Sequence, residues 1–309
     1  YLAIRQPEKI ILRIHNINKQ FNPNRSIYFP NSLLSLWKFA SYFIRQVVFK
    51  LFPVHRYFLN KRIQHFTFAD DGLKNYVITK KYLPADKVID SLPFKVFSST
   101  EAHSLFEDEL RITIIGSIDK KRRDYSVMIE AMKQIYQTDN SSIKISLTLL
   151  GSSKGEYGES VKSELMKINH PSLKCTFFDE RVNEAHFITV MNSSHLILSP
   201  IIEDARAEIY HEIYGKTKTS GSILDFMKFG IITLTPDYYS PPSELEKFIL
   251  KYSDGKNLAK LLTELHSDSS KLNLLNQKSK GFASKKYSKK EVFSICHTIF
   301  TSIKNKGNA

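Results

Sequence analysis

Between residues 110 and 236 the chain alternates short apolar runs with amphipathic stretches, and this alternation limits the possible folds more than any other feature of the sequence. The apolar runs are rich in β-branched residues, which favours buried strands, and two of them end in glycine. Strands that alternate with helices build a parallel, doubly wound α/β sheet. The predicted strands are Leu110–Gly116, Ile143–Gly151, Leu173–Phe178, His195–Pro200 and Ile231–Thr235, and the predicted helices include Tyr125–Tyr136, Ser160–Ile168 and Asn183–Met191.

A basic, hydroxyl-rich loop precedes a further predicted helix. The loop Lys216–Ser222 reads KTKTSGS and leads into an apolar pattern that stops at Gly230. Because Ser and Thr are good N-cap residues, we expect the helix to begin near Thr219–Ser222. Its free N–H groups and positive dipole end, next to two lysines, suit a phosphate or diphosphate. A capped surface helix with solvated lysines is the alternative, and the flanking strands favour the anion site.

Length and composition indicate a two-domain α/β protein. The chain has 309 residues, of which 42% are hydrophobic, enough to form two cores. Cys175 and Cys296 lie far apart and outside any CxxC motif, so neither a disulfide framework nor a zinc site is indicated and a reducing compartment fits. We place the domain boundary near residue 105. The chain begins at Tyr1 without a secretory signal, and we expect the first domain to lack its first strands.

Positive charge is concentrated near the beginning of the chain. The formal net charge is +14, and no acidic residue lies between Glu8 and Asp70. Such a field indicates a polyanionic partner, which leaves an anionic membrane, a nucleic acid or a phosphorylated substrate.

The most apolar stretch lies in this basic region. Ser32–Phe52 carries polar residues at helical spacing, and basic residues interrupt it too often for a membrane span. The pattern predicts a helix that lies in the headgroup region of a membrane. A helix packed on its own domain is the alternative. In the membrane interpretation, the residues expected at an exposed apolar surface are Trp37, Phe39, Phe43 and Phe49, with Lys38, Arg45, Lys50 and Arg56 beside them.

The first domain offers one candidate for acid–base chemistry. Lys9–Asn16 reads as a short buried strand that ends in His15 and Asn16. Side chains at the carboxyl end of a parallel strand face the ligand crevice of open α/β sheets. His15 is therefore a candidate catalytic residue, and a loop histidine without a chemical role is the alternative. Arg62–Ala69 reads as a second strand and Asp70–Lys80 as a helix.

The order of elements resembles the donor-binding domain of GT-B glycosyltransferases of the group 1 type. The resemblance covers Leu110–Leu265 and, more weakly, Lys9–Phe97. It rests first on Gly116, the basic loop that runs to Arg123, and Ala131 in the following helix. It implies that Arg123 holds the donor diphosphate. Ser117 stands where many members have arginine, so Arg122 is expected to compensate.

A second part of the resemblance lies in the helix after the KTKTSGS loop. LDFMKFG resembles the helix that carries the family's ribose-binding glutamate, which places Asp225 in that role. The family's other glutamate corresponds to Thr217, and this departure leaves the sugar contact open. FFDERVN resembles the turn that reads the base, which makes Arg181 and Val182 candidates. The acidic residues Glu203, Asp204, Glu208 and Glu212 are expected to form a solvated face.

The resemblance implies two Rossmann-like lobes and transfer of a sugar from a nucleotide-sugar to a membrane- or lipid-linked glycan. The domains would be 1–105 on the acceptor side, 106–285 for the donor, and 286–309 as a C-terminal helix and tail. We expect no cofactor and, since no Asp-x-Asp motif is evident, no metal. The enzyme would work at the inner face of the plasma membrane, without a nucleic-acid partner. The expected donor-binding residues are Gly116, Ser117, Arg122, Arg123, Arg181, Val182, Lys216, Lys218, Thr219, Ser220, Gly221, Ser222 and Asp225.

Two other functions remain compatible with the sequence. A nucleotide-sugar epimerase would keep the fold and change the reaction, although it would gain nothing from the apolar Ser32–Phe52 helix. A nucleic-acid-binding protein would use the positive field, but the sequence has no recognition helix, zinc spacing or aromatic RNA-binding signature. Binding of a nucleoside diphosphate would separate both enzymes from this last alternative.

Overall fold

The structure is a computed structural model that describes residues 10–22, 26–27, 33–44, 60–92, 96, 105–106, 108–137, 142–153, 155–207 and 210–307. The chain divides into two compact units. Unit 1 comprises Tyr1–Phe94, Asp204–Thr219 and Phe293–Ala309, and unit 2 comprises Lys95–Glu203 and Ser220–Val292. Within the described ranges, no helix combines the length and the apolar character needed to span a membrane.

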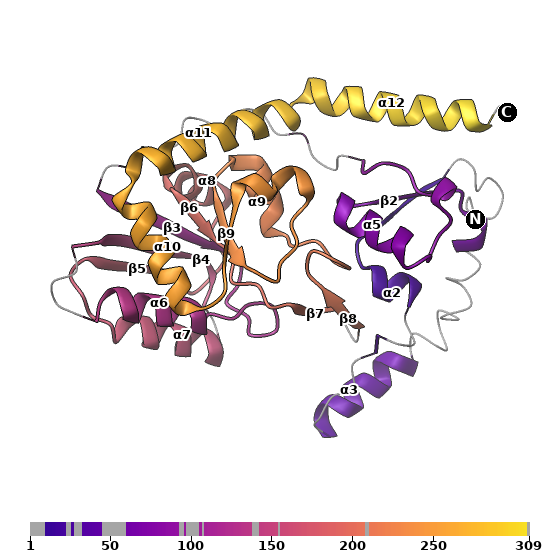
Figure 1. The fold of residues 1–309 in the computed structure, drawn as a ribbon. Helices are drawn as coiled ribbons and strands as arrows, with labels where there is room; N and C mark the ends of the chain where they lie inside the picture. The colour runs from indigo at the N-terminus through magenta and orange to yellow at the C-terminus, as the bar shows by residue number, and fades with distance from the viewer. Residues whose placement is uncertain are drawn as a thin grey trace. The chain divides into compact units, whose positions relative to one another are not determined.

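Unit 2 is built on a six-stranded sheet in the order β10-β9-β6-β3-β4-β5 (Figure 1). Every strand pair in this sheet is parallel. The five strands predicted from the sequence are confirmed, and β10 is an additional strand at the edge. The strands are β3 (Glu109–Ile115), β4 (Lys144–Ser152), β5 (Leu173–Phe178), β6 (Leu196–Leu198), β9 (Thr233–Pro236) and β10 (Ile249–Tyr252).

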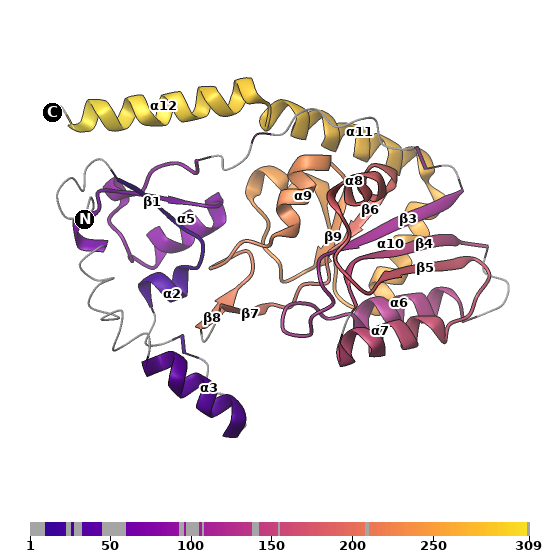
Figure 2. The ribbon, with the colours of Figure 1, turned by 180° about the vertical axis from the view of Figure 1, so that it is seen from behind.

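Helices cover both faces of this sheet. In Figures 1 and 2, α6 and α7 lie on one face, whereas α8, α9 and α11 lie on the other. Helix α10 packs against α6, and α11 packs against α9. The doubly wound arrangement is the one predicted from the alternating pattern. The bounds are α6 (Ser126–Ile135), α7 (Glu156–Met166), α8 (Glu184–Ser193), α9 (Ser222–Phe229), η5 (Ser243–Phe248), α10 (Gly255–Ser267) and α11 (Ser269–Lys286).

Aliphatic side chains at the carboxyl end of the sheet hold α8 and α9 in place. Ile115 and Leu150 from the ends of β3 and β4 pack with Met191 of α8 and Phe229 of α9, and all four are buried. Burial of large apolar side chains is the main stabilising term in such a core. The packing fixes both helices beside the strand ends, where a ligand of an open α/β sheet binds.

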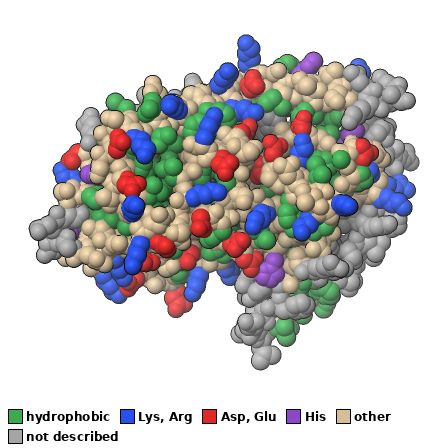
Figure 3. Space-filling view, in the orientation of Figure 1, with side chains coloured by type: hydrophobic (Ala, Val, Ile, Leu, Met, Phe, Trp, Pro, Cys, Tyr) green, Lys and Arg blue, Asp and Glu red, His purple; other side chains and the backbone are tan. Residues whose placement is uncertain are grey.

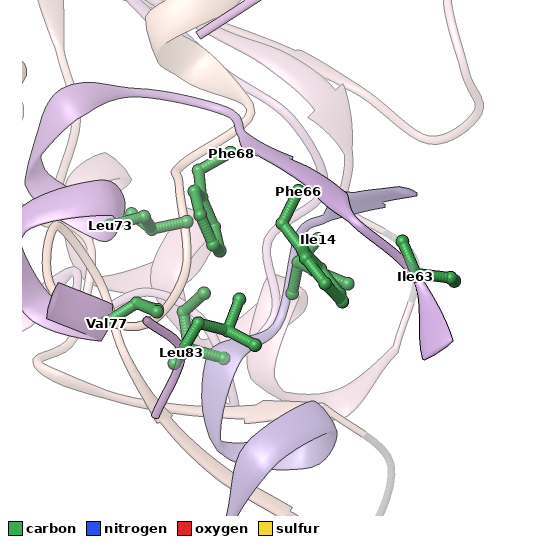
Figure 4. Close-up of a cluster of buried hydrophobic side chains, with 8 residues drawn as sticks. Ile14, Ile63, Phe66, Phe68, Leu73, Val77 and Leu83 are labelled. Carbon is green, nitrogen blue, oxygen red and sulfur yellow. The ribbon is translucent and has the colours of Figure 1, made fainter. Parts of the chain in front are cut away.

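Unit 1 contains a smaller sheet, in which β1 (Ile11–Ile14) pairs in parallel with β2 (His65–Phe68). Figure 4 shows its core, where Ile14, Phe66 and Phe68 from the strands face Leu73 and Val77 of helix α5. Asp70 caps that helix by accepting a hydrogen bond from the N–H group of Leu73. The predicted strands and helix are thus found. The remaining elements of this part are α2 (Ile17–Phe21), α3 (Leu33–Ile44), α5 (Asp71–Thr79) and η4 (Ala85–Lys87).

A β-hairpin that lies far along the sequence belongs to unit 1. Strand β7 (Asp204–Ala207) pairs antiparallel with β8 (Tyr210–Ile213), and the division into units assigns Asp204–Thr219 to unit 1. The continuous donor domain predicted over 106–285 is therefore interrupted. The last helix, α12 (Lys289–Gly307), begins in unit 2 and continues into unit 1 from Phe293.

Helix α3 covers the first part of the predicted apolar helix. Its side chains Trp37 and Phe43 are 76% and 42% exposed, in line with the predicted apolar surface. Phe39 is half-buried and stacks on Phe43 with 6.1 Å between the ring centroids. The other residues of that prediction, Arg45, Phe49, Lys50 and Arg56, lie outside the described residues, as does the side chain of Lys38.

Candidate functional site

A cavity of about 710 Å³ lies at the carboxyl ends of β3 and β4 in unit 2. Loops and helices that follow β5 and β6 complete its walls. Four residues predicted to bind the donor, Gly116, Arg181, Val182 and Asp225, line this one cavity. Gly151, marked in the sequence as a strand-end glycine, lines it as well, and the lining residues that the sequence did not single out are Ile115, Leu150, Asn183, Glu184, Phe187 and Lys228.

Two glycines from neighbouring strand ends form part of the cavity wall. Gly116 has a φ of 92°, in the left-handed region that favours glycine. A Cβ atom on Gly151 would lie 2.2 Å from the carbonyl oxygen of Gly116, closer than any real contact allows. Neither position accepts a side chain, because atoms of Arg123 and of the Gly116 backbone already occupy the space that a Cβ atom would need. Glycine thus brings the ends of β3 and β4 close together at the carboxyl edge of the sheet, where a ligand of an open α/β sheet binds.

Arg123 lies over the same glycine. A Cβ atom on Gly116 would come within 2.4 Å of Nη2 of Arg123, so the guanidinium group occupies the space that a side chain would fill. Nη1 of Arg123 donates a hydrogen bond to the carbonyl oxygen of Ser117 at 2.9 Å. The side chain of Arg123 is also half-buried. The hydrogen bond and this partial burial hold its positive charge at the end of β3.

The backbone of the basic loop is fixed on both sides. The N–H group of Ile202 donates to the carbonyl oxygen of Arg122 at 3.2 Å, and that of Asp124 donates to Pro200 at 2.8 Å. Arg122 itself is exposed, with Nε 3.6 Å from Oδ2 of Asp119. The two arginines therefore differ, since Arg123 is held against the strand end and Arg122 lies at the surface.

The side walls of the cavity carry charges of both signs. Asp225 and Lys228 come from α9 and lie one helical turn apart, so they share a face of that helix. On the side of β5, Asn183 caps α8 by accepting a hydrogen bond from the N–H group of His186 at 2.8 Å, and Glu184 follows it. Carboxylates accept hydrogen bonds from hydroxyl groups and an ammonium group binds anions or carbonyl oxygens. The cavity is therefore equipped to bind a polar ligand such as a nucleoside.

The spacing of Lys228 was a usable sequence signal that the prediction overlooked. Once Asp225 is placed on the ligand-facing side of a helix, the residue three positions later lies on the same side. Asn183, Glu184 and Phe187 could not be found in this way, because their place depends on how α8 packs on the sheet.

The KTKTSGS loop is shared between the two units. Helix α9 begins at Ser222, as predicted, and Ser220 and Gly221 precede it in unit 2. Ser220 is buried, and its carbonyl oxygen accepts a hydrogen bond from the N–H group of Ile223 at 3.3 Å. Lys216 to Thr219 belong to unit 1. The predicted role of Lys216, Lys218 and Thr219 in binding the donor stays a prediction from the sequence.

Within unit 1, contacts along the chain hold the first half of this loop. Thr217 is fully buried, and its hydroxyl oxygen accepts a hydrogen bond from the N–H group of Ile213 at 2.6 Å. The hydroxyl group of Thr219 donates to the carboxylate of Asp70. Nζ of Lys218 lies 5.7 Å from the centroid of the Tyr214 ring, a cation–π distance.

Glu212 anchors the hairpin to unit 1, and the expectation of a solvated side chain was wrong. The residue is fully buried, and its carboxylate accepts hydrogen bonds from the N–H groups of Asn18 at 3.2 Å and Lys19 at 2.9 Å. Burial raises the pKa of Glu212, although these hydrogen bonds and one from Thr217 act against the shift. Burial also raises the pKa of Asp70. A run of acidic residues in the sequence gives no sign that one of them pairs with a helix start about 190 residues away.

His15 lies directly after β1 and is exposed. Burial of part of the side chain, together with the positive charge of Arg13, lowers the pKa of His15 and so favours the neutral form of its imidazole. The next residue, Asn16, forms a β-bridge with Lys218, and the N–H group of Ile17 donates to Thr217 at 2.9 Å. The structure thus brings the segment after His15 against the lysine loop within unit 1. The catalytic role of His15 stays a prediction.

In the described part of the chain, no three His, Cys, Asp or Glu residues form a group that could hold a metal ion. Both cysteines are free and half-buried.

Comparison with solved structures identifies the architecture. The chain aligns with TarM of S. aureus at a TM-score of 0.57 and 11% identity, which covers 94% of this chain and 50% of TarM. With Anabaena HepE in complex with UDP-glucose, the TM-score is 0.54 at 11% identity, which covers 96% of this chain and 72% of HepE. The GtfA/B complex gives a TM-score of 0.58 at 11% identity over 98% of this chain and 55% of the other.

These structures are GT-B glycosyltransferases. The chain has the GT-B fold. The fold class predicted from the sequence is therefore confirmed. The chain spans half the length of TarM and 72% of that of HepE. No protein-family model matches the sequence, and no curated protein matches it.

Proposed function

We propose that this protein is a glycosyltransferase that moves a sugar from a nucleotide-sugar donor to a glycan acceptor. The observation that carries the proposal is the cavity at the carboxyl ends of β3 and β4, where Gly116, Arg181, Val182 and Asp225 meet. Solved structures of the same fold hold such donors, since HepE was determined with UDP-glucose and pneumococcal GtfA with UDP and GlcNAc. We therefore take a uridine diphosphate sugar as the first donor to test.

The proposed division of roles follows from the position of each group. Asp225 would accept hydrogen bonds from the ribose hydroxyl groups, and the backbone of residues 181–182 would contact the base. The diphosphate would lie at the end of β3 beside Gly116, within reach of the Arg123 guanidinium group that lies over this glycine. The N–H groups at the start of α9, after Ser220 and Gly221, would add hydrogen-bond donors and a positive dipole end.

In the proposed reaction the bond between the sugar carbon and the diphosphate oxygen breaks, and a bond from the acceptor oxygen to that carbon forms. Negative charge grows on the departing oxygen as its bond breaks. A fixed guanidinium group stabilises this charge more in the transition state than in the ground state, which accelerates the reaction. We propose that positively charged side chains take the place of a divalent ion. The acceptor loses a proton, and neutral His15 is the candidate to receive it.

We further propose that the acceptor is carried on lipid at the cytoplasmic face of a membrane, in the synthesis of a cell-surface polysaccharide. The exposed side chains of Trp37 and Phe43, with Leu36 and Ile44 on the same helix α3, support a membrane contact, because several exposed apolar side chains close together mark interaction surfaces. The absence of acidic residues between Glu8 and Asp70 favours an anionic surface. This part of the proposal is separable from the donor site, which lies in unit 2.

Calorimetric titration with UDP, GDP and ADP tests the donor site. We expect one of them to bind, and we expect Arg123→Ala to weaken binding by about 1.5–3 kcal/mol through loss of a charge-assisted contact. Arg122→Ala is the matched control, because this exposed side chain pairs with Asp119, and its effect should be smaller. Absence of binding by all three nucleotides would contradict the proposal.

Release of the nucleoside diphosphate from UDP-glucose or UDP-GlcNAc then tests the reaction. Release should require an acceptor, supplied as a membrane extract, and should persist when a chelator is added. An epimerase would instead convert the sugar without any acceptor.

A further inference from the structure

Helix α12 exposes two phenylalanines on one face. Phe293 and Phe300 are 71% and 53% exposed, and His297 and Lys304 are exposed as well. An α-helix turns by about 100° per residue, so these four positions lie along a single stripe. Phe293 and His297 stack with 6.3 Å between the ring centroids and an interplanar angle of 28°. The stripe is therefore an ordered aromatic surface that faces away from the protein.

The opposite side of the helix already provides its attachment to the protein. Val292 and Ile299 are 7% and 8% exposed, and Ile295 and Ile303 are half-buried. An amphipathic helix needs one apolar face to pack on its own core. Because that face is occupied, the two phenylalanines are not required for packing, and their exposure calls for another explanation.

Positive charge accompanies the aromatic stripe. Lys289 and Lys290 begin the same helix and are exposed, and they flank the stripe, one on each side of it. The one acidic residue of residues 269–309, Glu291, lies on a different side of the helix. Figure 3 shows lysine or arginine side chains and a histidine along the upper edge of the molecule, where α12 runs in Figure 1.

We propose that this stripe docks α12 onto an anionic lipid surface, with the phenylalanine rings between the acyl chains and the lysines at the headgroups. Lysines with long apolar stems beside exposed aromatic rings are typical of helices that lie in the membrane interface. Residues 269–309 contain no arginine, the residue most suited to bidentate contacts with nucleic acid. A second copy of the same stripe would bring like charges together. The lipid surface is therefore the occupant that fits both the charge and the rings.

Co-sedimentation of the full chain with vesicles tests the proposal. Vesicles of phosphatidylglycerol mixed with phosphatidylcholine should bind the protein, binding should fall as salt is added, and vesicles of phosphatidylcholine alone should bind it weakly. Lys290→Gln/Lys304→Gln should weaken binding roughly 30-fold, and Phe293→Ser/Phe300→Ser should also weaken it. The matched control is Lys271→Gln/Lys278→Gln, which removes two exposed lysines from α11 and should change binding much less.

The test separates this surface from the other proposals. The α12 variants keep Trp37 and Phe43 of α3, so a loss of vesicle binding in these variants reports on α12 alone. The α12 variants should also leave the affinity for UDP unchanged. The vesicle result therefore does not depend on whether the donor site is correct. The proposal is overturned if the α12 variants and the α11 control bind vesicles equally. It is also overturned if the α12 variants lose affinity for a single-stranded oligonucleotide but not for vesicles.

Discussion

Units 1 and 2 are both α/β structures, but they are assembled in different ways. Unit 2 joins most of its strands through helices, and five of its six strands lie at the places along the chain that the local pattern predicts. Unit 1 is assembled from segments that are far apart in the sequence, since residues 204–219 and the end of α12 belong to the same unit as the sheet of β1 and β2. The difference shows that local sequence patterns can determine the fold of unit 2, whereas the fold of unit 1 depends on contacts between residues that are far apart in the sequence.

The contacts that hold distant segments together are of a different kind in the two units. In unit 2 the critical contact is steric, between the backbones of Gly116 and Gly151. In unit 1 it is polar, between the buried carboxylate of Glu212 and N–H groups at the start of α2. Substitutions at these places should therefore destabilise the protein for different physical reasons, and each loss of stability can be measured separately.

The largest effect is expected for Gly151→Ala in unit 2. The new Cβ atom would lie 2.2 Å from a backbone oxygen, which cannot move without shifting the end of β3. We expect a loss of about 3 kcal/mol in the free energy of unfolding, measured by urea denaturation. Gly281→Ala is the matched control, because no atom lies within 4 Å of its new Cβ in α11. The control should stabilise the helix by up to about 1 kcal/mol, and an equal loss in both variants would contradict this account.

In unit 1, Glu212→Ala should cost about 2 kcal/mol. The substitution removes a charged acceptor and leaves the N–H groups of Asn18 and Lys19 without that partner in a buried place. Urea denaturation measures the loss, and Glu180→Ala, at an exposed site, serves as the control with an expected change below about 0.5 kcal/mol. Equal stability of Glu212→Ala and the wild type would show that the hairpin is not anchored by this residue.

The stability of Glu212→Gln, measured as a function of pH, should show how much the burial of the Glu212 carboxylate charge destabilises the wild type. Because the pKa of Glu212 is raised in the folded state above its ordinary value of 4.5, the folded protein retains this proton when the unfolded chain has lost it. The contribution of this group to stability is therefore full below the ordinary pKa and is lost as the pH rises through the folded pKa. Relative to the wild type, Glu212→Gln should become more stable as the pH increases from about 4 to 7. A difference that stays constant over this range would contradict the raised pKa.

Much of unit 2 could be predicted from the sequence because its signals are local. Period, β-branched content and strand-end glycines marked the strands, and hydroxyl-rich turns marked the start of α9. Within the site, Gly116 and Asp225 were found through motifs. Glu184 and Phe187 were not, because their place in the cavity depends on the packing of α8 on the sheet.

The hairpin of unit 1 could not be predicted in the same way. Asp204 and Glu212 read as solvated acids, since nothing nearby in the sequence shows the N–H groups that Glu212 binds. The distribution of the KTKTSGS loop between two units is equally invisible to local patterns. Its lysines follow a hairpin that belongs to unit 1, whereas its serines begin a helix of unit 2.

The smallest effect on stability is expected for Trp37→Ser/Phe43→Ser on α3. Both side chains are exposed, so removal of their rings should change the free energy of unfolding by less than about 0.5 kcal/mol each. Vesicle co-sedimentation should nevertheless show weaker binding to anionic lipid, because the rings would no longer enter the interface. A large loss of stability with unchanged vesicle binding would mean that the rings pack within the protein.

The most direct test of the central claim, that the cavity at the ends of β3 and β4 is the donor site, is a crystal structure of the protein with bound UDP. We predict the diphosphate beside Gly116 and the Arg123 guanidinium group, and the ribose hydroxyl groups at the carboxylate of Asp225. A fully occupied UDP molecule elsewhere, with this cavity filled only by solvent, would contradict the claim.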